Sequence, residues 1–104
     1  MRGVSAGTVI SGLNGEEETF RQALGYYEQG DLAAAGHICE QISPEAPERA
    51  SADHLLGLIA HEEGDSRRAV ELIRQAIDRE SDHPVWYANL GSVLRSAGRY
   101  EDAF

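Results

Sequence analysis

Residues 56–76 read LGLIAHEEGDSRRAVELIRQA, and this stretch decides the fold. On both sides of Gly64-Asp65 the apolar residues recur three and four positions apart, which is the spacing of one helix face. The second half and the residue after it carry the cleaner stripe, made of Ala69, Val70, Ile73, Ala76 and Ile77. Glycine can take the left-handed conformation that ends a helix, and aspartate can start the next one. The stretch therefore predicts two helices joined by a tight turn.

The same pattern returns every 34 residues along the chain. The positions that share this spacing are Gly30, Gly64 and Gly98, and also Ala35, Ala69 and Ala103. Leu56-Gly57 recurs as Leu90-Gly91, and Ala23 fills the equivalent place in the first unit. Small residues at these places let the two helices of a hairpin approach closely. A fixed period with one helix–turn–helix per unit is typical of stacked helical hairpins.

The sequence thus predicts an all-α protein of stacked antiparallel hairpins. No segment alternates with a period of two residues, so no strand is expected. We place a degenerate first unit at 16–49, a second unit at 50–83 and a third at 84–104. Residues 1–15 are expected to form a flexible tail.

Composition excludes several classes of function. The 104 residues include 18 acidic and 9 basic side chains, a net charge of −9, which disfavours binding to nucleic acid. No apolar run reaches the roughly 20 residues of a membrane helix, so no membrane contact is expected. The single cysteine permits no internal disulfide, which fits a reducing compartment and predicts a cytoplasmic protein.

The repeated pattern resembles the tetratricopeptide repeat. The second unit matches its frame at Leu56-Gly57, Gly64, Ala69, Ile73 and Ala76, and the third at Tyr87, Leu90-Gly91, Leu94, Gly98, Tyr100 and Ala103. The first unit departs most, since Gln22 stands where leucine is usual. The resemblance covers about residues 16–104. It implies a right-handed α-solenoid of about two and a half units that binds a protein or peptide and has no catalytic activity.

A narrower resemblance concerns residues 52–103, from ADHLLGLIAHEEG to LRSAGRYEDA. They are similar to the repeats ahead of the catalytic domain in bacterial relatives of O-linked N-acetylglucosamine transferase, the SPINDLY-type proteins. Similar repeats precede sulfotransferase and methyltransferase domains. This resemblance implies an alternative function, in which the chain recognises substrates for a larger glycosyl-, sulfo- or methyltransferase.

The tetratricopeptide resemblance also implies where a partner would bind, because the first helix of each hairpin lines the concave groove. The residues expected in this groove are Tyr27, His54, Leu58, His61, Asn89, Ser92 and Arg95. Asn89 falls where the O-linked N-acetylglucosamine transferases carry an asparagine that bonds peptide backbone. An asparagine amide offers both a donor and an acceptor, so it can pair with any peptide unit.

No arrangement of residues predicts an enzyme, a metal site or a cofactor. His54 and His61 are seven residues apart, too far for the i, i+4 pair of a zinc helix, and a surface role is expected. His37 and His83 have no visible partner. Cys39 falls at a repeat core position, where a buried structural thiol is the expectation.

The end of the chain raises the question of self-association. Ala97-Gly98 reads as a turn, and residues 99–104 read as the beginning of a new helix, so the third unit is predicted to be truncated in its second helix. The first helix of that unit would then expose apolar surface. A longer natural chain or a homodimer would each cover this surface, and we expect both. The natural chain is expected to continue, and this chain is expected to form a dimer with the following contact residues: Trp86, Leu94, Tyr100 and Phe104.

Overall fold

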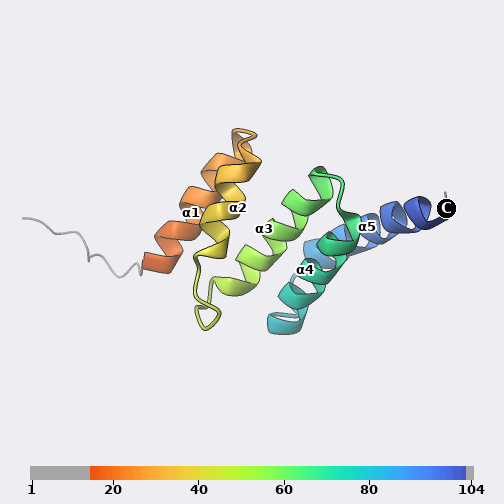
Figure 1. Ribbon diagram of the computed structural model, residues 1–104. Coiled ribbons are helices and arrows are strands. Elements are labelled where there is room, and N and C mark those ends of the chain that lie inside the picture. The colour runs from red at the N-terminus through yellow and green to blue at the C-terminus, as the bar shows by residue number, and fades with distance from the viewer. Residues whose placement is uncertain (1–14, 103–104) are drawn as a thin grey trace, which may run out of the picture.

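The computed structural model describes residues 15–102, which form five helices (Figure 1). They are α1 (Gly15–Glu28), α2 (Leu32–Glu40), α3 (Arg49–Glu62), α4 (Ser66–Arg79) and α5 (Pro84–Asp102). The described residues contain no strand, and the predicted all-α helical repeat is confirmed. The predicted flexible tail lies outside the described residues except for Gly15, which begins α1.

The turns inside the first two hairpins have the same construction. Gly30 and Gly64 have φ angles of 86° and 92°, in the left-handed region that glycine reaches without strain. The next residue in each turn is an N-cap: Asp31 accepts a hydrogen bond from the backbone N–H of Ala34, and Asp65 accepts one from Arg68, both at 3.1 Å. The shared turn follows from the Gly-Asp pair that the sequence repeats.

The two helices of the hairpin α3–α4 lie close together because Gly57 has no side chain. A Cβ atom built on Gly57 would lie 2.6 Å from Cγ1 of Ile73 and 3.2 Å from the backbone oxygen of Ala69. Ile73 and Ala69 are themselves completely buried. Glycine at position 57 therefore lets α4 lie directly on the backbone of α3.

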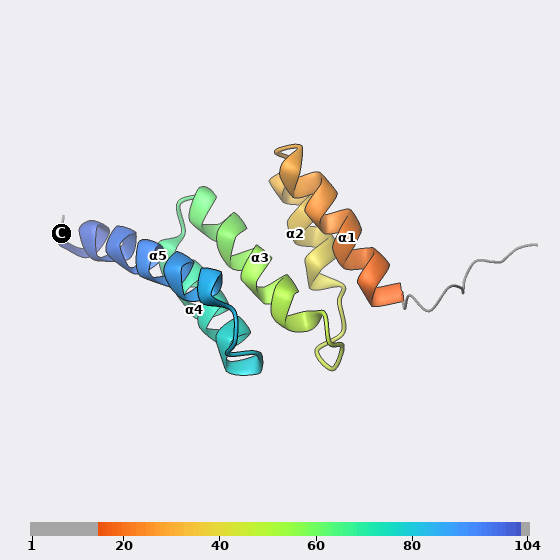
Figure 2. The ribbon, with the colours of Figure 1, turned by 180° about the vertical axis from the view of Figure 1, so that it is seen from behind.

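The five helices form two layers. Helices α1, α3 and α5 lie on one side and α2 and α4 on the other, as the two opposite views show (Figures 1 and 2). The molecule is elongated, measuring 61 × 27 × 19 Å along its principal axes. The layers meet in one main core, whose larger members are Ile42, Leu55, Leu56, Ile59, Leu72, Ile73 and Val93.

A buried carboxylate joins the first hairpin to the second. Asp53 on α3 is 1% exposed and forms ion pairs with Arg49 at 2.8 Å and with Arg79 at 3.2 Å. The same guanidinium groups donate to backbone carbonyls of the loop after α2: Arg49 to Ile42 and Arg79 to Pro44, both at 2.8 Å. Asp53 thus holds two arginines that fix the connection between the hairpins.

The turn predicted at Ala97-Gly98 is wrong, because α5 continues through both residues to Asp102. Gly98 does not have the positive φ of Gly30 and Gly64. A separate helix after Gly98 would need a nucleation step of its own, which is unfavourable. Continuing an existing helix adds a hydrogen bond with each residue, so the single long helix is favoured.

Candidate protein-binding surface

The residues expected in the groove lie on α1, α3 and α5, the three helices of one layer (Figure 2). Two polar pairs cross from one helix of this layer to the next. Tyr27 of α1 bonds Glu62 of α3, and His54 of α3 bonds Asn89 of α5. The residues of each pair are 35 positions apart, one more than the repeat period, so each side chain contacts the position that follows its own equivalent in the next unit.

Tyr27 and Glu62 form the first crossing. The phenol O–H of Tyr27 donates to a carboxylate oxygen of Glu62. Burial, together with this hydrogen bond and the negative charge of Glu62, raises the pKa of Tyr27 to about 12. The phenol therefore stays protonated at neutral pH and acts as a fixed donor between α1 and α3.

His54 and Asn89 form the second crossing, at 3.0 Å between Nε2 of the ring and Nδ2 of the amide. The ring of His54 also stacks on Trp86, with centroids 4.9 Å apart and planes inclined by 14°. Burial and the neighbouring His83 lower the pKa of His54 to about 4. At neutral pH the ring is uncharged, so its Nε2 can accept a hydrogen bond from the Asn89 amide.

The other expected groove residues are less closely connected. Leu58 and His61 are half-buried on α3, and Leu58 packs against the main core. Ser92 and Arg95 are exposed on α5. Among the described residues, the side chains of Ser92 and Arg95 form no hydrogen bond to another helix. Among the expected groove residues, the polar pairs between helices therefore lie where α3 faces α1 and α5.

The residues expected at a self-association contact have different positions. Trp86 was expected near such a contact, but its side chain is only 8% exposed, packed with Ala50 and Ala76 and stacked on two histidines. Core packing within one chain therefore covers most of the indole, and a role of Trp86 near a contact between two chains stays a prediction. Leu94 is 40% exposed, as a contact residue would be. The side chains of Tyr100 and Phe104 lie outside the described part of the chain.

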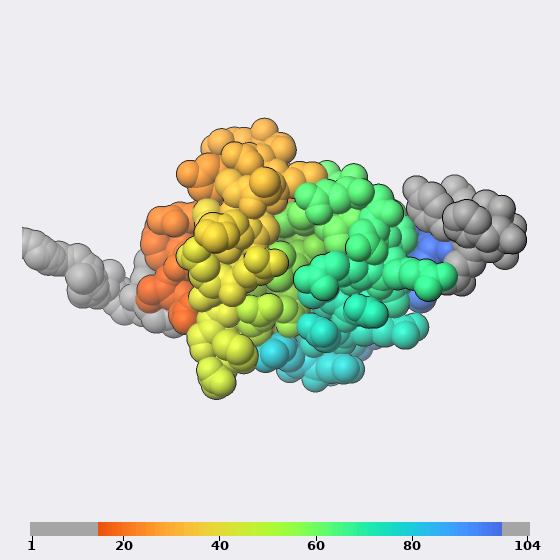
Figure 3. All heavy atoms as spheres, in the orientation of Figure 1, coloured from red at the N-terminus to blue at the C-terminus, as the bar shows by residue number. Residues whose placement is uncertain are grey.

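Two features of the surface were not found by sequence reasoning. One is a groove of about 270 Å³ between α2 and α4, with α3 as its floor (Figure 3). Its floor includes Leu56 and Ile59, and its rim includes Glu40, Glu63 and Arg68. Nothing in the periodic pattern signals such a groove, because it depends on how far apart two non-consecutive helices lie.

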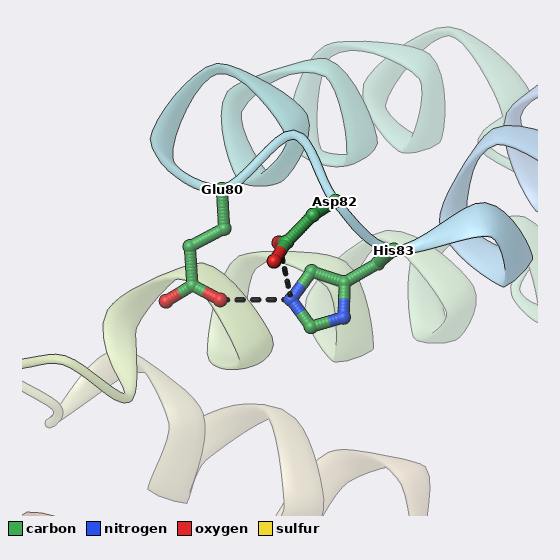
Figure 4. Close-up of side chains that lie close together, drawn as sticks. All are labelled: Glu80, Asp82 and His83. Carbon is green, nitrogen blue, oxygen red and sulfur yellow. Dashed lines mark hydrogen bonds and ion pairs between the residues drawn. The ribbon is translucent and has the colours of Figure 1, made fainter.

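The second feature is a cluster in the loop between α4 and α5, formed by Glu80, Asp82 and His83 (Figure 4). His83, for which the sequence showed no partner, lies 2.8 Å from an oxygen of Glu80 and 3.6 Å from one of Asp82. The proximity of the three residues in sequence was the available signal, but the direction of the side chains could not be read from it.

Cys39 is buried at the position where the repeat core was expected. Burial is the main reason that the pKa of its thiol is raised to about 11. The thiolate is the reactive form of cysteine, so this residue is chemically inert in the folded chain. Its role is packing between α2 and its neighbours.

The comparisons with known proteins agree with this architecture. Residues 51–83 match the family model described as "Tetratricopeptide repeat", a segment that begins within one residue of the second unit and ends with it. This match and the all-helical structure support a tetratricopeptide repeat protein. No curated protein matches the chain. Within residues 15–102, no helix combines the length and the apolar character needed to cross a membrane.

Proposed function

We propose that the chain is a non-catalytic binding module whose α1–α3–α5 layer takes an extended peptide segment of a protein partner. Tetratricopeptide repeats are in general protein-interaction modules, which supports the class of function. The observation that carries the proposal is the His54–Asn89 pair, which holds an amide in place beside the stacked Trp86.

This pair suits a peptide backbone for a chemical reason. One N–H of the Asn89 amide is used on neutral His54, which leaves a second N–H and the carbonyl oxygen of the same amide. A peptide unit needs one acceptor and one donor, whatever its side chain. Exposed Ser92 and Arg95 lie further along α5 and would contact the same ligand.

Binding of a random-peptide library to the immobilised chain tests this proposal. Peptides selected on the unchanged protein should bind Asn89→Ala about tenfold more weakly, since a lost backbone pair costs about 1–2 kcal/mol. Gln75→Ala is the matched control, because Gln75 is exposed on α4 in the opposite layer. Selection of peptides that bind Asn89→Ala as well as the unchanged protein would contradict the proposal.

Self-association is a second proposal for the same module. A groove of about 380 Å³ between α4 and α5 is lined by apolar Val70, Leu94 and Ala97, with Gly98 and the charged residues Arg67 and Glu71 beside them. Pairing of two such faces would cover them, as exposed apolar surface commonly requires. Leu94→Glu is expected to convert a dimer into a monomer in light scattering; a monomeric unchanged protein at high micromolar concentration would rule the dimer out.

The similarity to SPINDLY-type repeats supports one further alternative, a substrate-recognition segment of a larger transferase. This alternative stays a prediction from the sequence. Reading the native gene past the codon for Phe104 tests it, because the alternative requires a transferase domain in the same chain.

A further inference from the structure

The loop between α4 and α5 brings together one imidazole and two carboxylates within four residues (Figure 4). Nε2 of His83 faces an oxygen of Glu80 at 2.8 Å and an oxygen of Asp82 at 3.6 Å. The facing ligand atoms of all three residues lie within 4.8 Å of one another. These are a nitrogen and two oxygens of the kinds that bind borderline divalent metal ions.

The loop that carries these groups is tied at several points. The phenol O–H of Tyr87 donates to the carbonyl of Ser81 at 3.0 Å, and the backbone N–H of Trp86 donates to the carbonyl of His83 at 3.0 Å. The backbone N–H of Glu80 still donates to Ala76 in the last turn of α4. The backbone between the ligands is therefore ordered by hydrogen bonds of its own.

The imidazole itself is also oriented. The ring of His83 stacks on Trp86, with centroids 3.8 Å apart and planes inclined by 16°. This contact, with a residue buried in the core between α4 and α5, directs Nε2 towards the two carboxylates (Figure 4). Stacking restricts the rotation of the ring, so less conformational freedom would be lost when Nε2 binds an ion.

One of the two distances from His83 fits a small tetrahedral ion, and the other is too short until Glu80 moves. Two ligand atoms that each lie about 2.1 Å from a zinc ion are about 3.4 Å apart in tetrahedral geometry. The pair of His83 with Asp82 is near that separation at 3.6 Å, and the pair with Glu80 is shorter at 2.8 Å. A rotation of the partly exposed Glu80 side chain suffices to open the shorter pair.

We propose that Glu80, Asp82 and His83 form a binding site for Zn²⁺ at the junction of α4 and α5. The ion would take Nε2 of His83 and one oxygen from each carboxylate, and water would fill the fourth position. A purely oxygen-seeking ion such as Mg²⁺ is disfavoured, because imidazole is a ligand for the softer metals. The proposal does not depend on the peptide-binding function proposed above.

The test uses the protein's own reporter. Trp86 is the only tryptophan of the chain and stacks directly on His83, so zinc binding should change its fluorescence. Titration of the tag-free protein with zinc chloride, followed by fluorescence and by calorimetry, should show one ion bound per chain. Zinc should also raise the thermal midpoint, since a ligand that binds only the folded state stabilises it.

Variants separate this site from other zinc-binding groups. Glu80→Gln and Asp82→Asn remove one ligand each with little change of shape, and His83→Phe keeps a stacking ring but removes the nitrogen. Each should weaken zinc binding by about tenfold or more. Two control variants should bind zinc like the unchanged protein. Asp78→Asn removes a carboxylate from an exposed position of α4, and His37→Phe removes an exposed histidine of α2.

Two results would overturn the proposal. One is the absence of saturable binding by the unchanged protein up to about 1 mM zinc, where the binding free energy would be weaker than about 4 kcal/mol. The other is binding that all three site variants retain, which would place the ion elsewhere. In either case the cluster would be only a hydrogen-bonded loop.

Discussion

At the scale of single residues, Gly57 and Gly91 occupy the same place in successive units but have different surroundings. A Cβ atom at Gly57 would collide with Ile73 at 2.6 Å, whereas one at Gly91 would meet only the guanidinium of Arg95 at 3.9 Å. The difference arises because α4 covers α3 at Gly57, while no described helix covers α5 at Gly91.

Gly57→Ala should therefore destabilise the chain, by about 1–3 kcal/mol, because the added methyl group overpacks a closed helix pair. Gly91→Ala is the matched control and should stabilise it by about 0.5–1 kcal/mol through higher helix propensity. Urea denaturation followed by circular dichroism measures both. Equal effects of the two substitutions would show that α4 does not lie this close to α3.

His54 gives a prediction for pH. Its pKa is about 4 in the folded chain, below its ordinary value of 6.5, so the unfolded chain binds the proton more readily. The free energy of unfolding should hence be fully retained above pH 6.5 and should fall as the pH is lowered towards 4. The loss is expected to be on the order of 2 kcal/mol.

Urea midpoints at pH 7.5 and pH 5 measure this loss. His54→Gln should flatten the dependence, whereas His37→Gln should not, because His37 is exposed. Because carboxylates also titrate in acid, the effect of His54 is taken from the difference in pH dependence between the two variants. An unchanged slope in His54→Gln would mean that the buried ring does not stay neutral in the folded chain.

At the scale of helices, glycines at the same position of successive units have different conformations. Gly64 lies in the turn after α3 and has a φ of 92°, whereas Gly98, one period later, lies inside α5. The repeat pattern predicts a turn at both places. At Gly64 the chain turns and α4 packs back on α3, whereas α5 continues through Gly98.

Alanine should distinguish these two states. Gly64→Ala is expected to cost about 1–2 kcal/mol, because an L-residue is strained in the left-handed region. Gly98→Ala is expected to stabilise α5 by about 0.5–1 kcal/mol and to increase helical content. Denaturation with circular dichroism detection gives both values. A destabilising Gly98→Ala would indicate that the chain turns there after all.

At the scale of the whole molecule, the hairpins are coupled through few contacts, and Asp53 is central to them. Its carboxylate is almost completely buried and holds Arg49 and Arg79, which bind the loop carbonyls of Ile42 and Pro44. In repeat proteins, stability depends on such interfaces between neighbouring units. Loss of Asp53 should therefore loosen the first hairpin from the second.

Asp53→Ala should cost about 3–5 kcal/mol, because it leaves arginines without their buried partner. Asp78→Ala, which removes an exposed acid of α4, should change stability by no more than about 0.5 kcal/mol. Denaturation measures the cost, and hydrogen exchange should show faster exchange in α1 and α2. Equal costs for the two variants would mean that the buried ion pairs do not join the hairpins.

How much the sequence could predict depends on the range of the interaction. The helices up to residue 97, the two Gly-Asp turns and the close approach at Gly57 follow from spacing within one unit, because helix periodicity and capping are local. The cross-helix pairs of Tyr27 with Glu62 and of His54 with Asn89 could not be predicted as pairs. Tyr27, His54 and Asn89 were expected in the groove only because the sequence resembles a repeat family in which the first helix of each hairpin lines the groove.

The sequence by itself determined that this chain is a helical repeat, because a 34-residue period with helical spacing of apolar residues on both sides of each Gly-Asp pair is typical of stacked helical hairpins. Only the tertiary structure decided the burial of Trp86, the continuation of α5 through Gly98 and the grouping of Glu80, Asp82 and His83. These features depend on which neighbouring element covers a residue and in which direction a side chain points. A local pattern carries neither kind of information, since both are set by packing between units.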